Sequence, residues 1–237
     1  MQITKFKKPK IRLKFMTFNK KLSLPIFFTR VFIFVFIFGG FLFYTPTVQA
    51  AAKPDLGTAA DFAIISGTTI TNTGATSVTD GDVGGIGAYA PAGLTTYTMT
   101  NGTIYPTPGN ATTLQAQADA VAAVAAIQAL ANDDSTAVLA MGGGKTWLPG
   151  VHQVVGAATL AGTATLDAQG DPNAVFIFKI TTTFTTAASS IVELTGDAQA
   201  CNVFWVPTTA PTLGINSTFK GTLMSPAAVI VSSGANV

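Results

Sequence analysis

The segment VHQVVGAATLAGTATLD, residues 151–167, contains three kinds of short strand in a fixed order. Its first part, residues 151–154, is strongly apolar, and its second, residues 159–161, places one apolar residue between Thr and Ala. Its third part, residues 165–167, ends in an acidic residue. Gly and small residues separate the parts, as they do at turns between strands. This order predicts three strands that follow one another around one turn of a coil.

The same order recurs along the chain, with the apolar strand returning at intervals of 24, 28 and 19 residues. The apolar kind occurs at residues 62–65, 151–154, 175–178, 203–206 and 222–224, the Thr-flanked kind at 69–71, 159–161, 183–185, 212–214 and 229–231, and the charged kind at 77–79, 165–167, 191–193 and 218–220. Three strands per repeat, separated by Gly-rich turns, are typical of a β-solenoid. We therefore predict a mainly β fold with a roughly triangular cross-section.

One segment departs from this pattern. Residues 112–131 are rich in Ala and contain no Gly, Pro or aromatic residue, which predicts a helix of about five turns. Thr112 and Gln115 match a capping box at its start. Its larger apolar residues are spread around the circumference, so we expect a wide contact face. The helix lacks the basic face of a membrane-active helix. We expect it to pack on the apolar strands, which are apolar on both sides.

Composition divides the chain at residue 50. Residues 51–237 hold four Lys, no Arg and all 11 acidic residues, so their net charge is −7, which argues against nucleic-acid binding. The single Cys excludes a disulfide framework and a Cys-rich metal site. One His leaves little room for His-based catalysis or a His-rich metal cluster. We predict no enzyme activity, no cofactor and no bound metal.

The first 50 residues have the order of a secretory signal peptide. Basic residues are frequent in residues 1–30, the run VFIFVFIFGGFLFY follows at residues 31–44, and VQA at residues 48–50 fits a signal-peptidase site. We predict cleavage after Ala50, a secreted domain at residues 51–237, and no stable membrane insertion after cleavage. An uncleaved signal anchor is the alternative, and Met16 is a second candidate for the start.

Alternation along the Thr-flanked strands predicts one unusual surface. Ile70, Leu160, Phe184, Leu213 and Ile230 are expected to point inward, so their neighbours point to solvent. Those neighbours are uncharged, and most are Thr. Stacked coils would place them about 4.8 Å apart, in a flat grid of hydroxyl and methyl groups that suits ordered water or a crystal surface. The plainer explanation is that Thr is a good strand former.

Five segments resemble the secreted microbial ice-binding (antifreeze) proteins. They are DLGTAADFAIISG (residues 55–67), ITNTG (70–74), LPGVHQV (148–154), TLDAQGDPNAVFIFKI (165–180) and GDAQACNVFW (196–205). The resemblance implies a right-handed, discontinuous β-solenoid with the helix packed alongside and the N-terminal strands between later coils. It also implies binding through a flat face bearing Thr, Ser and Ala, and a T-A/G-x-T/N motif that matches residues 73–76, with weaker counterparts at 213–216 and 233–236. Relatives usually continue beyond Val237, so the sequence is a fragment or its last coil has an unpaired edge.

We therefore predict a monomeric ice-binding protein whose partner is the ice crystal surface, giving thermal hysteresis and inhibition of recrystallisation. The candidate residues are Thr69, Thr71, Thr73, Thr159, Ala161, Thr163, Thr183, Thr185, Thr212, Gly214, Asn216, Val231 and Ser233. A cell-surface adhesin that binds polysaccharide or protein is the alternative, and a polysaccharide enzyme is a distant third.

Four other features of the sequence lead to separate predictions. The DGD segment at residues 80–82 resembles a calcium loop but lacks the repeated spacing, so a turn is expected. Asp167 and Asp171 flank a Gly/Pro turn, where Asp commonly bonds the backbone. His152 is expected to be an ordinary strand residue. Cys201, in an apolar segment, is expected to be buried.

Overall fold

The computed structural model describes residues 51–85, 97–105, 110–136 and 140–237. These residues belong to one compact unit, Thr47–Val237. Residues 1–50, where the signal peptide is predicted, lie outside the described residues. Within the described ranges, no helix is both long and apolar enough to cross a membrane.

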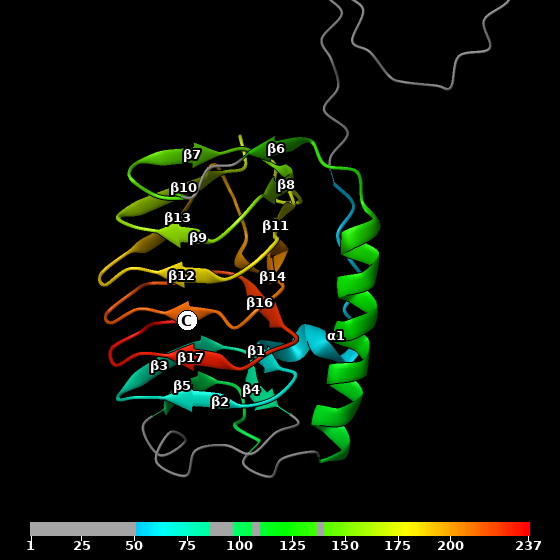
Figure 1. Cartoon of the computed structure of the whole chain (residues 1–237), viewed down its shortest axis with the longest axis vertical. Helices are drawn as coiled ribbons and strands as arrows, with labels where there is room; N and C mark the ends of the chain where they lie inside the picture. Colours follow the sequence, from blue (N-terminus) through cyan, green and yellow to red (C-terminus); the bar gives the residue numbers. More distant parts are fainter. Residues whose placement is uncertain (1–50, 86–96, 106–109, 137–139) are drawn as a thin grey trace, which may run out of the picture. The chain divides into compact units, whose positions relative to one another are not determined.

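The described residues are mainly β, with one long helix (Figure 1). Every pair of hydrogen-bonded strands is parallel. We call the sheet of seven strands sheet A. It has the order β4 (Asp82–Gly85), β1 (Phe62–Ser66), β16 (Thr222–Ser225), β14 (Val203–Pro207), β11 (Phe176–Ile180), β8 (Gly150–Val154) and β6 (Asp134–Thr136).

Two further sets of strands complete each coil. Sheet B has the order β2 (Ile70–Asn72), β17 (Val229–Val231), β15 (Thr212–Leu213), β12 (Phe184–Thr186) and β9 (Ala158–Leu160). Sheet C comprises β13 (Ile191–Thr195), β10 (Thr163–Asp167) and β7 (Lys145–Trp147), with the pair β3 (Thr76–Asp80) and β5 (Tyr97–Asn101). Single bridges at Thr218 and Asn236 link β13 to β3. From β1 to β3 and again from β8 to β17, the chain passes through sheets A, B and C in turn, as the repeat predicted, with the bridge at Thr218 in the place of a sheet C strand between β15 and β16.

The coils are not stacked in sequence order. β1 pairs with β16 on one side and with β4 on the other, so the N-terminal coil lies between the C-terminal coil and β4. The predicted unpaired edge at Val237 is wrong for this residue. Its N–H donates to Ser77 O at 2.9 Å, and its carbonyl accepts from Thr79 N at 2.9 Å.

Several elements differ from the predicted strands. Residues 218–220 form only a bridge at Thr218, and β4, β5, β6 and β7 were not among the predicted strands. β4 ends in two Gly residues, which disfavour a strand in any prediction from propensity. A Cβ atom on Gly84 would lie 2.7 Å from Phe62 and 2.8 Å from Thr113, so the missing side chain allows close packing of β4 beneath the helix.

The helix α1 (Ala111–Ala129) begins one residue earlier than predicted. Its N-cap is Asn110, whose side chain accepts a hydrogen bond from Thr113 N at 2.9 Å. The predicted capping box of Thr112 and Gln115 is therefore wrong, because Thr112 already lies inside the helix.

The predicted wide contact face of α1 is also wrong. A narrow stripe is buried, consisting of Thr113, Ala116, Ala120, Ala123 and Ile127. Leu114 and Val121 are 51% and 57% exposed. The stripe covers sheet A and the 3-10 helix η1 (Gly57–Asp61), which confirms that the helix packs on the apolar strands. At its C-terminal end, Lys179 Nζ donates to Leu130 O at 2.8 Å, and burial lowers the pKa of this lysine.

The core has two parts. One fills the coils and includes a run of aromatic rings, in which Phe178 and Trp205 stack at 4.2 Å and Trp205 and Phe184 at 5.0 Å. The other lies between sheet A and α1. Sheet B therefore has the interior of the coils on one side, and its other side carries the candidate site.

Candidate functional site

One row of side chains runs across the outer side of sheet B. The register pairs Thr185 with Thr159 and Thr212, Thr212 with Ile230, and Ile230 with Thr71. A bridge to Ala140 extends the row beyond Thr159. We call Thr71, Ile230, Thr212, Thr185 and Thr159 the central row. Adjacent coils in a sheet lie about 4.8 Å apart, so these five residues form a regular line.

Smaller residues flank the central row two positions away on each strand. Backbone hydrogen bonds between coils set the register of the flanking residues, for example from Val229 N to Thr69 O at 3.0 Å and from Thr73 N to Val231 O at 3.1 Å. One flanking row contains Thr69, Ala228, Ala210, Thr183 and Ala157, and the other contains Thr73, Ser232, Gly214, Ala187 and Ala161. The central row thus stands between two lines of mostly small side chains.

The hydroxyl groups of the central row are available to solvent. Among the described residues, the side chains of Thr71, Thr159, Thr185 and Thr212 form no hydrogen bond to protein. Other Thr residues of the sheet differ. Thr183 Oγ1 donates to Ala210 O at 2.8 Å, and the buried Thr186 Oγ1 accepts from Gly214 N at 2.7 Å. The row therefore presents uncommitted hydroxyl and methyl groups at a fixed spacing.

Charge distinguishes sheet B from its neighbour. None of the residues in the central and flanking rows is charged. On sheet C, the outward positions include Asp167 and Glu193, and Thr165 Oγ1 lies 3.4 Å from a Glu193 oxygen. An uncharged surface binds its surrounding water less strongly than a charged one, and this favours a partner that is itself neutral.

The structure reverses the predicted orientation of β17. Val231, a candidate residue, is fully buried, as is Val229, whereas Ile230 is 37% exposed and belongs to the central row. The sequence VIV is apolar at all three positions, so alternation alone does not identify its inner side. The pairing of Ile230 with Thr212 and Thr71 shows that Ile230 is the outward-facing residue.

Three other candidates lie beside sheet B rather than on it. Thr163 begins β10 and pairs with Ile191 in sheet C. Asn216 and Ser233 are exposed at the turns between sheets B and C, where Asn216 has a φ of 54° and its N–H donates to Ser233 O at 3.0 Å. The remaining candidates, Thr69, Thr71, Thr73, Thr159, Ala161, Thr183, Thr185, Thr212 and Gly214, lie in the three rows.

The motif at residues 73–76 is offset from its predicted counterparts. Thr73 N bonds Val231 O, and Ser232 N bonds Leu213 O, so Thr73 stacks with Ser232 and Gly214. The structural counterparts of residues 73–76 are therefore 232–235 and 214–217. Each predicted counterpart was shifted by one residue, because the motif aligns Gly214 and Gly234 with Gly74, whereas Gly74 lies beside Ser233 in the structure.

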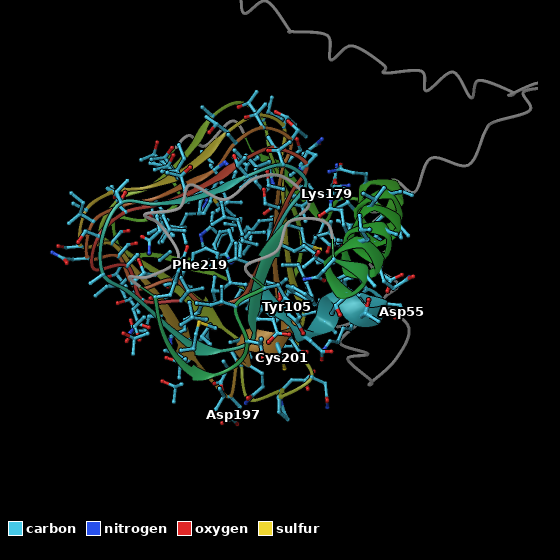
Figure 2. All side chains as sticks on the ribbon, turned by 90° about the horizontal axis from the view of Figure 1, so that it is seen from below. Asp55, Tyr105, Lys179, Asp197, Cys201 and Phe219 are labelled. Carbon is cyan, nitrogen blue, oxygen red and sulfur yellow. The ribbon has the colours of Figure 1, made fainter. Side chains whose placement is uncertain are left out.

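Four expectations outside sheet B can be compared with the structure. His152 lies on β8, as predicted, and is buried. The segment 80–82 forms a turn between β3 and β4, with Gly81 at a φ of 101°. Asp167 accepts from Gln169 N and Asp171 from Asn173 N, both at 2.9 Å, as expected for turn residues. The prediction that Cys201 is buried is wrong, since its thiol is free and exposed beside η1 (Figure 2).

Neither of the two hollows described in the structure lies over the central row. The two hollows described, of about 240 and 210 Å³, are lined by residues of η1, β3 and the segments around Cys201 and Thr222. Across the described ranges, no three His, Cys, Asp or Glu side chains converge as metal ligands. The arrangement on sheet B is therefore suited to contact over an extended surface and not to enclosing a small molecule.

Comparison with known proteins identifies the family. The family model described as Ice-binding-like matches residues 64–237. The chain belongs to the ice-binding-like family. It is 33% identical to an ice-binding protein of Nostoc sp. (strain HG1) over 191 residues, which are 80% of this chain and 68% of that protein. It is 32% identical to ice-binding protein 1 of Shewanella frigidimarina, and covers 24% of that longer protein.

Solved structures of ice-binding proteins share the fold. The protein of the Antarctic ascomycete Antarctomyces psychrotrophicus superposes with a TM-score of 0.67 at 30% identity, over 78% of this chain and 98% of that one. The protein of an Antarctic Flavobacteriaceae bacterium superposes with a TM-score of 0.70 at 31% identity, over 82% of this chain and 50% of that one. The family predicted from the sequence is thus confirmed.

Proposed function

We propose that this protein binds ice through the outer side of sheet B and acts as an antifreeze protein. The observation that carries the proposal is the central row, whose four Thr hydroxyls are uncommitted and whose neighbours are uncharged. Its relatives and structural neighbours are named ice-binding proteins. We also infer that Ile230 takes the place of Val231 among the contact residues, because Ile230 is the exposed residue of its strand.

The chemistry of the row suits a solid water surface. Each hydroxyl can donate to one water and accept from others, and each methyl group restricts the water around it. The stacked strands hold these groups at about 4.8 Å along the row, so little conformational entropy is lost on binding. The small residues of the flanking rows leave space beside the central row in which water molecules can be held. Many weak contacts act together because all of them meet one flat partner.

Adsorbed molecules would stop the growth of ice between them. Ice then advances only as curved surface between the bound proteins, and curvature lowers the local freezing point. The same pinning slows the transfer of water from small crystals to large ones. Thermal hysteresis and inhibition of recrystallisation are therefore the expected activities, and neither requires catalysis. We infer accordingly that the protein is not an enzyme and needs no cofactor.

Other features belong to the same proposal. We infer a right-handed coil with a triangular section, from the three strands per repeat and the family resemblance. We also infer that residues 1–50 are a signal peptide, that residues 51–237 are secreted without stable membrane insertion, and that they act as a monomer. The apolar strands of sheet A are covered by α1, so no large apolar surface of the described strands demands a second copy.

The experiment uses the protein comprising residues 51–237 in a slowly growing ice hemisphere. The expected result is enrichment of the protein in the ice, with faceted crystals and measurable hysteresis. A same-sized protein without ice affinity is the control and should be excluded from the ice. Exclusion of this protein to the same extent, with specific retention on a polysaccharide matrix, would overturn the proposal and favour an adhesin.

A further inference from the structure

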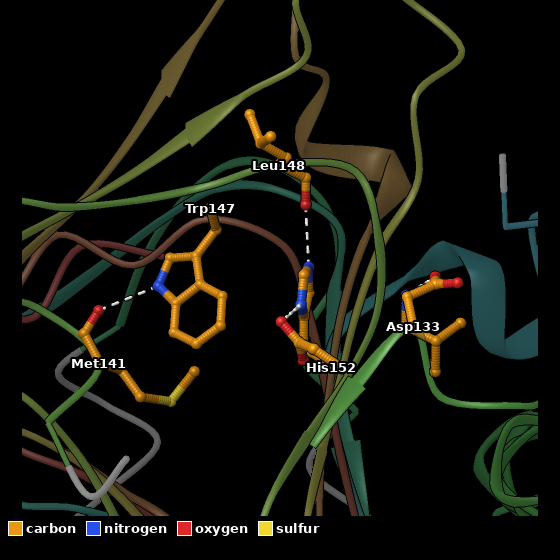
Figure 3. A network of polar contacts seen from close by, with 7 residues as sticks. Asp133, Met141, Trp147, Leu148 and His152 are labelled. Carbon is orange, nitrogen blue, oxygen red and sulfur yellow. Dashed lines mark hydrogen bonds and ion pairs between the residues drawn. The ribbon is translucent and has the colours of Figure 1, made fainter. Parts of the chain in front are cut away.

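A buried imidazole joins three elements at the β6 end of the stack (Figure 3). His152, on β8, is 6% exposed. Its Nδ1 lies 3.0 Å from Asp134 Oδ2 on β6, and its Nε2 lies 2.8 Å from Leu148 O in the turn between β7 and β8. The ring therefore connects β6 and the β7–β8 turn to the coil that contains β8 and β9.

The two contacts require an additional proton. A backbone carbonyl can only accept, so Nε2 carries a hydrogen in the contact with Leu148. A carboxylate can also only accept, so either Nδ1 carries a second hydrogen or the carboxyl group of Asp134 is protonated. In both cases the pair of His152 and Asp134 holds one proton more than a neutral ring beside an ionised carboxylate.

The side chain of Asp134 is 42% exposed to water, but few protein groups among the described residues bond it if that proton is lost. Its second oxygen, Oδ1, is buried and has no hydrogen-bond partner among the described residues. Lys145 interacts electrostatically with Asp134, but its Nζ lies over the Trp147 ring, 3.5 Å from the centroid. Desolvation lowers the pKa of Lys145, and the charge of Asp134 opposes this shift.

The other charged groups near the ring are already engaged. Asp133, next to β6, accepts a hydrogen bond from Val151 N at 2.8 Å. Lys179, on the neighbouring strand β11, donates to the end of α1. The face of the imidazole itself is stacked on Phe178 with ring centroids 5.2 Å apart. The shared proton is thus the main source of attraction between His152 and Asp134.

The imidazole is connected to the first Thr of the central row. Trp147 meets the ring edge-on at 5.0 Å, and its indole N–H donates to Met141 O at 3.1 Å. Met141 N in turn donates to Thr159 O at 2.8 Å, and Ala140 bridges to Thr159. Residues 140–147 therefore lie between the pair and the end of sheet B.

We propose that His152 and Asp134 form a proton-dependent latch that positions residues 140–147 beside Thr159. The latch would fix one end of the ice-binding face, so this inference rests on the proposed function of sheet B. With the shared proton in place, both contacts of the ring are satisfied. Once that proton is lost as pH rises, a lone pair of the ring faces the carboxylate, and the latch weakens.

The test follows amide hydrogen exchange in residues 51–237 between pH 5.5 and 8.5. The protection factor of Met141 N–H, corrected for the intrinsic effect of pH, should fall by about tenfold or more as pH rises, which corresponds to the loss of one charge-assisted hydrogen bond. Phe219 N–H, bonded to Asn236 O at 2.8 Å in a coil distant from β6, is the internal control and should stay constant. Constant protection at Met141 would overturn the proposal.

Asp134→Asn is the matched variant. Its amide can donate to Nδ1 of a neutral ring while Nε2–H still bonds Leu148, so Met141 protection should be high and independent of pH. His152→Phe keeps a ring between Trp147 and Phe178 without either hydrogen bond, and it should give low protection at every pH. A wild-type pH profile in either variant would contradict the latch.

Ice adsorption on the same samples separates the two proposals. Adsorption of the wild type should weaken with rising pH, and that of Asp134→Asn should not. If the protection of Met141 N–H depends on pH while ice adsorption does not, the link between the latch and the face is overturned. Absence of adsorption at every pH would overturn the proposed function, and Met141 protection would still decide whether the latch exists.

Discussion

Sheets A and B belong to the same coils and share the same core, but the outer side of sheet A is buried and the outer side of sheet B is exposed. The outer residues of sheet A are large and apolar and lie buried beneath α1, as Val151, Ile177 and Phe204 do. The central row of sheet B is mostly Thr and is covered by no described element (Figures 1 and 2). Every residue of β11 is buried, whereas the middle residue of β12 is not.

The difference shows how the chain distinguishes a packed surface from a binding surface. An apolar outer side needs a cover, and the Ala stripe of α1 supplies one at close range. A Thr-bearing outer side can stay in water without cost, because its hydroxyls are solvated. The outer side of sheet B is therefore free to meet an external partner, and four predictions test this contrast.

The largest expected effect comes from truncating an outer residue beneath the helix. Ile177→Ala should lower the free energy of unfolding by about 2–5 kcal/mol, because it leaves a cavity between β11 and α1. Ile230→Ala removes the same atoms from sheet B, where Ile230 is 37% exposed, and should cost less than about 1 kcal/mol. Chemical denaturation of both variants gives the comparison. Equal losses would mean that sheet B is as well covered as sheet A.

A smaller effect is expected at the attachment of the helix end. Lys179→Met should cost about 1–3 kcal/mol, because Leu130 O loses its donor in a partly buried setting. Thermal unfolding measures the change, and Lys220→Met is the control on another coil. If both variants unfold like the wild type, Lys179 does not help to hold α1 on sheet A.

The smallest effect concerns the start of the helix. Asn110→Ala should cost about 1 kcal/mol, because Thr113 N loses its capping acceptor. Thr112→Ala, at the position that the sequence suggested as the cap, should leave the unfolding free energy nearly unchanged. A larger fall in the denaturation midpoint for Thr112→Ala than for Asn110→Ala would support the predicted capping box instead.

Much of this contrast was predictable from the sequence. The apolar strands showed that sheet A is covered, and the Ala-rich segment identified the cover. The Thr-flanked strands identified sheet B, because alternation of one apolar residue with Thr specifies both an inner and an outer side. That argument correctly predicted that Thr71, Thr159 and Thr185 point away from the core.

The errors arose where the sequence lacks alternation or depends on distant contacts. Val229, Ile230 and Val231 are all apolar, so only pairing with Thr212 and Thr71 decides which of them is exposed. Cys201 lies in an apolar segment, but the short 3-10 helix at Ala200–Asn202 turns it toward solvent. The contact face of α1 was misjudged because Ala, and not the larger residues, gives the close approach to sheet A.

One pair of variants decides whether the outer side of sheet B binds ice. Thr185→Tyr places a large ring in the middle of the central row, and Thr165→Tyr places the same ring on sheet C. Thermal hysteresis and circular dichroism are measured for both. Thr185→Tyr should lose most of its hysteresis while its circular dichroism stays native, and Thr165→Tyr should keep both. Unchanged hysteresis in a folded Thr185→Tyr protein would contradict ice binding through sheet B.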